Sequence, residues 1–260
     1  RIINKYDLTY FCVCGSMLGA KRHNGFIPWD DDLDVGMPRD DYEKLLTVLP
    51  KELPAGIKLQ SPNNDKYSPV LFAKLRLLGT KFTEASNKGA RSQYNEIFID
   101  IFPYDGFGVV EKKARKQAKK LIMYRKLINN SIYRSRFKTN GFIKRIMQIA
   151  VRFLTIFISP RYLIKKYNRL VARYLFDDSV YVINSNTNLK EFLKREVLIT
   201  DLSDRNVTFE GLTVSGVAKP EIYLTTFYGD WQKLPPEDQR GNYHNIIDLD
   251  FGGYESKEFY

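Results

Sequence analysis

The stretch that decides the fold is GSMLGAKRHNGFIPWDDDLDVG, residues 15–36. Directly after Trp29, four of the next five positions are aspartates: Asp30, Asp31, Asp32 and Asp34. Carboxylates a few ångströms apart repel one another, and each would be better hydrated alone. The run therefore indicates that a cation lies among these side chains.

Three interpretations of the acidic run are open. The first is a solvated turn, although apolar neighbours such as Ile27 and Leu33 are unusual in a freely hydrated loop. The second is a calcium-binding EF-hand loop, but that loop needs a glycine where Val35 stands. The third is a divalent-metal site, because Asp32 and Asp34 alternate on an expected strand and so project from one face. We favour the third, since the flanking sequence completes a larger pattern.

The upstream part of that pattern is typical of a phosphate-binding turn. Residues 7–15 are rich in aromatic and small apolar side chains and predict a buried strand that ends at Gly15. A short helix is expected over residues 16–22, with Ser16 as its N-cap. Gly15 would let the backbone approach a phosphate closely, while Ser16 and the helix N-terminus offer hydrogen-bond donors.

The downstream part supplies carboxylates from two more expected strands, residues 32–37 and residues 96–102. The second of these strands has one interior charge, Asp100, in an apolar run that is costly for a carboxylate. In phosphoryl transfer, Asp32 and Asp34 would hold Mg²⁺, or alternatively Mn²⁺, against a diphosphate. Asp100 would complete the coordination and accept the proton of the attacking hydroxyl. Pairing of Asp100 with a neighbouring arginine is the simpler alternative.

Two pairs of basic residues are candidates for binding the phosphates of a donor. Arg22 and His23 lie a few residues before the acidic run, within KRHNGFIPWDDD. They can contact phosphate there, or serve only as a helix cap and a surface residue. Lys74 and Arg76 share one face of an expected strand over residues 70–78. They can neutralise a diphosphate, or simply be solvated.

The remaining elements follow from periodicity and turn residues. Residues 81–83 are expected to pair with residues 70–78 as a hairpin. We also expect helices over residues 38–49, 111–175 and 220–228, strands over residues 180–183 and 207–217, and an irregular C-terminal tail. The two cysteines, Cys12 and Cys14, share a strand face and cannot easily bridge, which favours a reducing, cytoplasmic compartment.

Charge is distributed unevenly along the 260-residue chain. The net charge is +11, yet residues 112–173 hold 19 basic and no acidic side chains, which leaves 22 basic against 30 acidic residues elsewhere. Within this segment, residues 142–159 place apolar side chains on one face and cations on another, which favours an interfacial helix on anionic lipid over a membrane span. An ordinary helical subdomain is the alternative. Nucleic acid is disfavoured because no nucleic-acid motif is present.

The block GSMLGAKRHNGFIPWDDDLDVGMPRDDYEKL resembles the hallmark block of the LicD family, which includes phosphocholine transferases and is related to fukutin-related protein. Three further stretches are similar to that family and occur in the same order: FAKLRLLGT, IDIFPYDGF and FYGDWQKLPPEDQR.

The resemblance implies a nucleotidyltransferase-like fold of the α+β class, with a mixed sheet, flanking helices and a basic helical insertion. We expect a catalytic core over residues 1–110, the basic subdomain over residues 111–178, and a part that completes the catalytic domain over residues 179–260. For Arg240 and His244 the resemblance suggests a segment that closes over substrate.

The implied reaction is transfer of a phosphorylated alcohol from a nucleotide diphosphate donor, with CDP-choline the best-known donor, to a sugar hydroxyl. We expect the acceptor to be a cell-surface glycan, such as teichoic acid or capsule, or its lipid-linked precursor. The protein would then associate peripherally with the inner face of the plasma membrane through residues 112–173. Alternatives are transfer of ribitol phosphate or glycerol phosphate, and a non-catalytic module that binds glycan or lipid.

Overall fold

The structure is a computed structural model of the chain. It describes residues 1–68, 70–85, 94–107, 111–132, 146, 149, 153, 158–172, 181–184, 196–197, 206–241 and 244–254.

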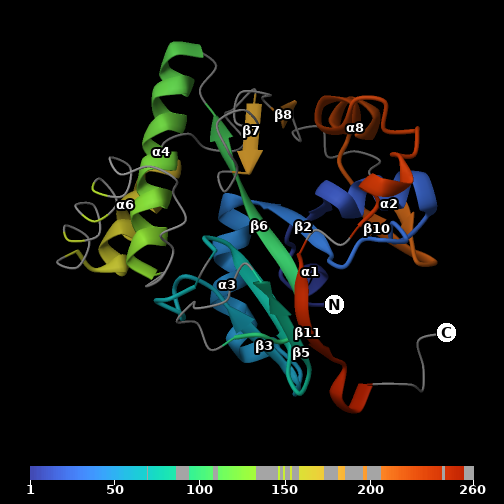
Figure 1. Cartoon of the computed structure of the whole chain (residues 1–260), viewed down its shortest axis with the longest axis horizontal. Coiled ribbons are helices and arrows are strands. Elements are labelled where there is room, and N and C mark those ends of the chain that lie inside the picture. The colour runs from blue at the N-terminus through green and yellow to red at the C-terminus, as the bar shows by residue number, and fades with distance from the viewer. Residues whose placement is uncertain are drawn as a thin grey trace.

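A mixed sheet forms the centre of the molecule (Figure 1). Its order is β1-β2-β6-β4-β3, and β7 and β8 continue from the far end of β6. Only the β2–β6 pair is parallel among these strands. The strands are β1 (Phe11–Cys12), β2 (Asp34–Pro38), β3 (Ile57–Gln60), β4 (Ala73–Leu77), β6 (Phe98–Phe107), β7 (Tyr181–Asn184) and β8 (Glu196–Val197). The mixed sheet confirms the predicted α+β class.

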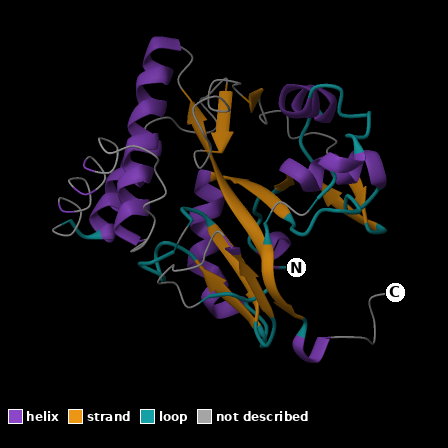
Figure 2. Ribbon diagram, in the orientation of Figure 1, coloured by secondary structure: helices purple, strands orange, loops and turns teal. Residues whose placement is uncertain are grey.

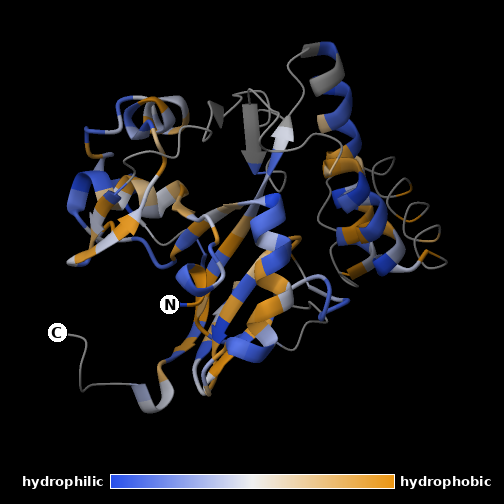
Figure 3. Cartoon of the chain, turned by 180° about the vertical axis from the view of Figure 1, so that it is seen from behind, coloured by the Kyte–Doolittle hydropathy of each residue, from blue (hydrophilic) through white to orange (hydrophobic). Residues whose placement is uncertain are grey.

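Helices flank the sheet, with the α4–α6 pair on one side and α2 and α8 on the other (Figure 2). The helices are α1 (Ile2–Lys5), α2 (Cys14–His23), α3 (Arg39–Glu52), α4 (Glu111–Ile132), α6 (Pro160–Val171) and α8 (Pro220–Tyr228), with 3₁₀ turns η2 (Glu237–Gln239) and η3 (Gly252–Tyr254). Helix α8 has the predicted bounds. Helix α3 lies behind the sheet, and Figure 3 shows its alternating hydrophilic and hydrophobic residues.

The predicted pairing of residues 81–83 with residues 70–78 is wrong. Strand β5 (Lys81–Glu84) does not form a hairpin with β4, because β3 and β6 occupy both edges of β4. It pairs instead with β11 (Ile246–Asp250), in the segment predicted to be an irregular tail. The predicted strand region 207–217 is a hairpin of β9 (Asn206–Phe209) and β10 (Leu212–Ser215).

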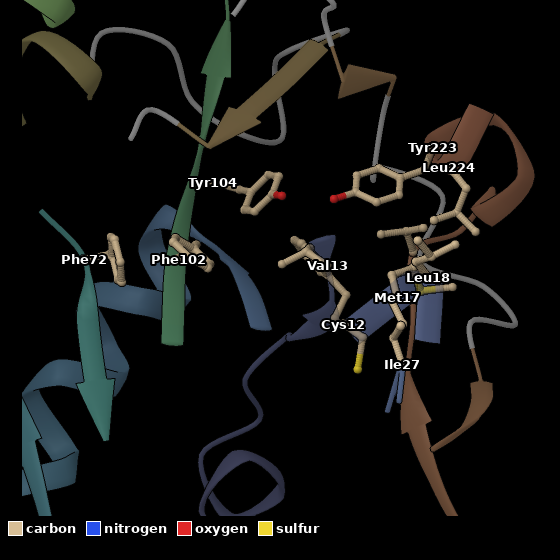
Figure 4. Close-up of a cluster of buried hydrophobic side chains, with 12 residues drawn as sticks. Cys12, Val13, Met17, Leu18, Ile27, Phe72, Phe102, Tyr104, Tyr223 and Leu224 are labelled. Carbon is tan, nitrogen blue, oxygen red and sulfur yellow. The ribbon is translucent and has the colours of Figure 1, made fainter. Parts of the chain in front are cut away.

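One buried cluster joins the start of the chain to helix α8 (Figure 4). Phe11 packs edge-on against Tyr104, with ring centroids 5.2 Å apart. A Cβ atom at Gly36 would overlap both rings, so only glycine fits there. The hydroxyl of Tyr223 in α8 accepts a hydrogen bond of 2.9 Å from the backbone N–H of Cys14. This packing fixes α2 beside β2, the strand that carries Asp34.

Helices α4 and α6 pack on each other through a second cluster that includes Leu121, Ile128 and Tyr167. They confirm the helical prediction for the parts of residues 111–175 that are described. Most of the predicted amphipathic helix over residues 142–159 lies outside the described residues. Within it, Ile146, Ile149 and Phe153 are helical, and each is at least 50% exposed.

Candidate active site

Three neighbouring strands place two carboxylates and one ammonium in a row. The parallel register of β2 and β6 sets Asp34 opposite Asp100, and the antiparallel register of β6 and β4 sets Lys74 opposite Asp100. Residues opposite each other in a sheet project from the same face, so the three side chains converge. They come from positions up to 66 residues apart in the sequence.

Asp32 joins this row from the loop that precedes β2. The strand begins at Asp34, two residues later than predicted, so Asp32 is not part of the regular alternation. Its carboxylate nevertheless reaches the row: ligand oxygens of Asp32, Asp34 and Asp100 all lie within 4.8 Å of one another. The structure thus brings together the three carboxylates that the sequence pattern predicts to hold a metal ion.

The cluster holds more negative charge than its buried cation can balance. Lys74 Nζ lies 2.7 Å from Asp100 Oδ1 and 3.0 Å from Asp100 Oδ2. Burial raises the pKa of Asp100, an effect that Lys74 opposes. Burial, reinforced by Asp32 and Asp100, raises the pKa of Asp34 well above its ordinary value. Burial likewise raises the pKa of Asp32 to about 7, against the opposing effect of His244. The carboxylates therefore favour either protons or a further cation.

A divalent ion fits the donor atoms that are present. Among the described residues, the buried Oδ1 of Asp34 has no hydrogen-bond partner, although the residue is only 7% exposed. A buried acceptor of this kind costs free energy unless something binds it. Carboxylate oxygens are the ligands that Mg²⁺ and Mn²⁺ take. Asp32, Asp34 and Asp100 are thus a chemically suitable set for either ion.

The predicted phosphate turn differs from expectation. Helix α2 begins at Cys14, whose φ of 50° is left-handed, so Ser16 lies inside the helix and is not its N-cap. Ser16 Oγ instead accepts a hydrogen bond of 2.7 Å from the backbone N–H of Asp34. A Cβ at Gly15 would overlap the carboxylate of Asp30. Gly15 and Ser16 therefore position the acidic loop and β2.

A cavity of about 360 Å³ opens beside the carboxylates. Five of the predicted site residues line it: Gly15, Arg22, Asp32, Asp34 and His244. Other lining residues lie outside the predicted set, and among them are Trp29, Tyr228, Asp230, Trp231 and Lys233. Four of these residues belong to the stretch FYGDWQKLPPEDQR. The similarity of this stretch to the LicD family was therefore the sequence signal that could have identified them.

The other predicted cations do not all reach the cavity. Arg22 lines it and donates a hydrogen bond of 3.0 Å to the carbonyl of Trp231. His23 accepts a bond of 3.0 Å from Arg22 Nε and is not among the lining residues. The guanidinium of Arg240 lies over the ring of Trp29, 5.3 Å from its centroid.

Lys74 and Arg76 are buried and not solvated, at 3% and 2% exposure. Lys74 is held by Asp100, and Arg76 donates a hydrogen bond of 2.9 Å to Gln60 Oε1. Neither lines the cavity. The structure therefore does not place this pair where it could contact a diphosphate there.

His244 lies at the acidic loop, where the resemblance suggested a closing segment. Its Nδ1 is 2.7 Å from Asp31 Oδ1, and its Nε2 is 3.5 Å from Asp32 Oδ2. Burial lowers the pKa of His244, but the bond to Asp31 and the charge of Asp32 outweigh it and raise that pKa above its ordinary value.

A mixed sheet that presents an Asp-x-Asp motif and a third strand carboxylate beside a cavity defines a protein of the nucleotidyltransferase class. The chain belongs to the LicD family: the model of the LicD/FKTN/FKRP nucleotidyltransferase domain matches residues 7–139.

Individual relatives agree with this assignment. The chain is 28% identical over 254 residues to a lipopolysaccharide cholinephosphotransferase, LicD, of Haemophilus influenzae, an alignment that covers 94% of this chain and 89% of that protein. Shorter matches connect it to uncharacterized proteins of Rickettsia prowazekii, 42% identical over 51 residues, and Rickettsia typhi, 36% identical over 60 residues. Each of these two alignments covers 19% of the rickettsial protein, and 20% and 23% of this chain, respectively.

We predict that Lys74→Met strongly destabilises the metal-free protein, because it leaves Asp100 buried without its cation. Breaking a buried ion pair from one side costs about 3–5 kcal/mol. The measurement is the free energy of unfolding in urea. Lys81→Met is the matched control, because the Lys81–Asp248 pair is about half exposed and screened by water, so its loss should lower the free energy of unfolding far less. Equal losses in the two variants would contradict the role given to Lys74.

Proposed function

We propose that this protein transfers phosphocholine from a CDP-linked donor to a sugar hydroxyl of a cell-surface glycan or its lipid-linked precursor, with the help of a divalent metal ion. As a member of the LicD family the chain is a transferase. The observation that carries the proposal is the buried cluster of Asp32, Asp34 and Asp100 beside a cavity lined by both tryptophans of the chain. The Haemophilus relative is named as a cholinephosphotransferase, which supports the choice of phosphocholine.

The three carboxylates would hold Mg²⁺ or Mn²⁺. When bound, such an ion offsets the negative charge of a diphosphate and of the transition state. Asp100 is 4% exposed, pairs with Lys74 and does not line the cavity. We therefore assign Asp100 to holding the ion, and not to the proton transfer that the sequence pattern also suggested. Arg22 and Lys233 line the cavity, and in this proposal they would bind the oxygens of the donor's phosphates.

The aromatic lining of the cavity favours a cationic donor group over a neutral polyol. Trp231 and Tyr228 line the cavity together with the carboxylate of Asp230. Quaternary ammonium groups bind to aromatic faces through the ring quadrupole. A ribityl or glyceryl group would instead need paired hydrogen-bonding groups for its hydroxyls. The aromatic residues that line the cavity thus support choline as the alcohol carried by the donor.

We predict that Trp231→Ala weakens binding of CDP-choline by about 5- to 30-fold, the equivalent of ~1–2 kcal/mol of cation–π attraction. The same variant should bind the neutral carbon isostere, CDP-3,3-dimethylbutanol, nearly as well as the unchanged protein does. Calorimetric titration with both donors gives the comparison. Tyr162→Ala, an exposed aromatic on α6, is the control. Equal losses of affinity for both donors would show that Trp231 does not interact with the positive charge of choline.

We predict that Asp32→Asn and Asp100→Asn each reduce transfer to background while the protein still folds. Each change removes a charged ligand from the proposed metal site. The assay measures release of CMP and labelling of a glycan acceptor, and circular dichroism checks the fold. Asp248→Asn, at an exposed carboxylate, should leave turnover unchanged. An unchanged protein that binds acceptor but never releases CMP would instead be a non-catalytic binding module.

We propose further that the basic subdomain, residues 111–178, docks on anionic lipid at the cytoplasmic face of the plasma membrane, where a lipid-linked acceptor would be found. Exposed cations lie along both described helices of this subdomain: Arg115, Lys116, Lys119, Lys120, Lys126, Arg161, Lys165 and Arg169. Exposed apolar side chains at Ile146, Ile149 and Phe153 lie in the same subdomain. Across the described residues, no helix combines the length and apolar character needed to span a bilayer. Surface docking needs only cations and a modest apolar face.

We predict that the protein sediments with vesicles containing phosphatidylglycerol, and less so as salt rises from 0.1 M to 1 M, because the screening length falls from ~10 Å to ~3 Å. Reversing the charge of Lys116, Lys119 and Lys120 to Glu should reduce binding. Three reversals at exposed lysines elsewhere, Lys44, Lys51 and Lys58, are the control. Binding that resists salt, or that both triple variants reduce equally, would contradict docking through α4.

A further inference from the structure

His244 is held rigidly at the edge of the carboxylate cluster. It lies two residues before β11, and the backbone carbonyl of the intervening Asn245 accepts a hydrogen bond of 3.0 Å from the N–H of Ala85, just after β5. Its imidazole ring meets the rings of Phe82 and Phe98 edge-on, with centroids 5.9 Å away in each case. Strand pairing thus fixes the backbone, and two aromatic rings fix the side chain.

The two ring nitrogens of His244 face two different aspartates. Nδ1 is 2.7 Å from Asp31 Oδ1, and Nε2 is 3.5 Å from Asp32 Oδ2. Asp32 therefore belongs to two sets of potential metal ligands, one with Asp34 and Asp100 and one with Asp31 and His244. Histidines that bind metals usually donate the N–H of one ring nitrogen to a carboxylate, which orients the other nitrogen toward the ion. The Asp31–His244 pair has this arrangement.

A separate observation points to an ion in the set of Asp32, Asp34 and Asp100. Asp34 is nine-tenths buried, and its Oδ1 has no hydrogen-bond partner among the residues that the structure describes. Asp34 lies two residues after Asp32, whose carboxylate is shared by both sets of ligands. The oxygen that lacks a partner and the imidazole of His244 thus belong to two adjoining sets of ligands, which share Asp32.

We propose that His244 Nε2 is a ligand of the divalent ion held by Asp32, Asp34 and Asp100, with Asp31 as the residue that orients the imidazole. This inference rests on the metal site put forward under the proposed function. A histidine ligand would change which metal ion the site prefers. Mg²⁺ prefers an all-oxygen environment, whereas imidazole nitrogen is a better ligand for transition metals. A site of three carboxylates and one imidazole should therefore favour Mn²⁺ over Mg²⁺.

The sequence offers an unusually direct test, because the chain contains only two histidines, His23 and His244. The experiment uses the full chain without a histidine tag, loaded with Mn²⁺ alone. Electron spin-echo envelope modulation detects a nitrogen bonded to Mn²⁺ and distinguishes ¹⁴N from ¹⁵N. His244→Gln removes the proposed ligand. His23→Gln is the matched control, because His23 does not line the cavity.

We expect nitrogen modulation in the unchanged protein and in His23→Gln, and its loss in His244→Gln. Labelling histidine with ¹⁵N in His23→Gln, which leaves His244 as the one labelled histidine, should shift the modulation to that of ¹⁵N without any change at the site. In competition titrations, the preference for Mn²⁺ over Mg²⁺ should fall at least about tenfold in His244→Gln.

Two results would overturn the inference while leaving the metal site in place. The first is that the unchanged protein binds Mn²⁺ but shows no nitrogen modulation. The second is that nitrogen modulation persists in His244→Gln. The first would indicate that His244 acts as a charged bridge between Asp31 and Asp32. Failure of the unchanged protein to bind Mn²⁺ at all would overturn both the inference and the metal site.

Discussion

The parallel pairing of β2 with β6 is the constraint on which the site depends, because its register sets Asp34 directly opposite Asp100. Two unit charges about 4 Å apart repel by roughly 4 kcal/mol at an effective dielectric constant near 20. Asp32 adds a third negative charge, and Lys74 supplies one positive charge. A fold that keeps these groups together in a buried place must compensate them, and a bound divalent ion does so most directly. In the proposed function, the same electrostatic imbalance would be the source of the cluster's affinity for a cation.

The rest of the fold serves to hold that pairing in place. Gly36 lets the rings of Phe11 and Tyr104 meet across β2, and Tyr223 ties α8 to the start of α2. Helix α8 in turn leads into the loop that carries Trp231 to the cavity. Strand β11 returns near the end of the chain and places His244 beside Asp32. Apolar packing therefore offsets the free-energy cost of the acidic cluster. Elements from both ends of the chain contribute to that cluster.

The sequence predicted those parts of the site that a single strand can reveal. Asp100 could be predicted because a single charge in an apolar strand is costly to bury. Asp32 and Asp34 could be predicted from their spacing. It could not reveal the pairing of β5 with β11, since these strands are separated by 161 residues and Ile246–Asp250 has only mixed alternation. His244 and Asp31 are 213 positions apart, so no local pattern links them. The misplaced N-cap has a local cause: the left-handed φ of Cys14 starts the helix early, and a non-glycine residue gives no warning of it.

The uneven charge along the chain fits the proposal that one region binds the donor and another docks on the membrane. A nucleotide diphosphate donor is anionic, and a site built on aspartates attracts it only once cations occupy the cluster and line the cavity, as Arg22 and Lys233 do. The surplus of positive charge lies elsewhere, on α4 and α6, where it is of no use to the donor. A surface of that kind suits a partner that carries many negative charges at once, as an anionic membrane does. In the proposed function, this separation would keep the enzyme near a lipid-linked acceptor without placing a basic surface at the carboxylates, where it would compete with the metal ion.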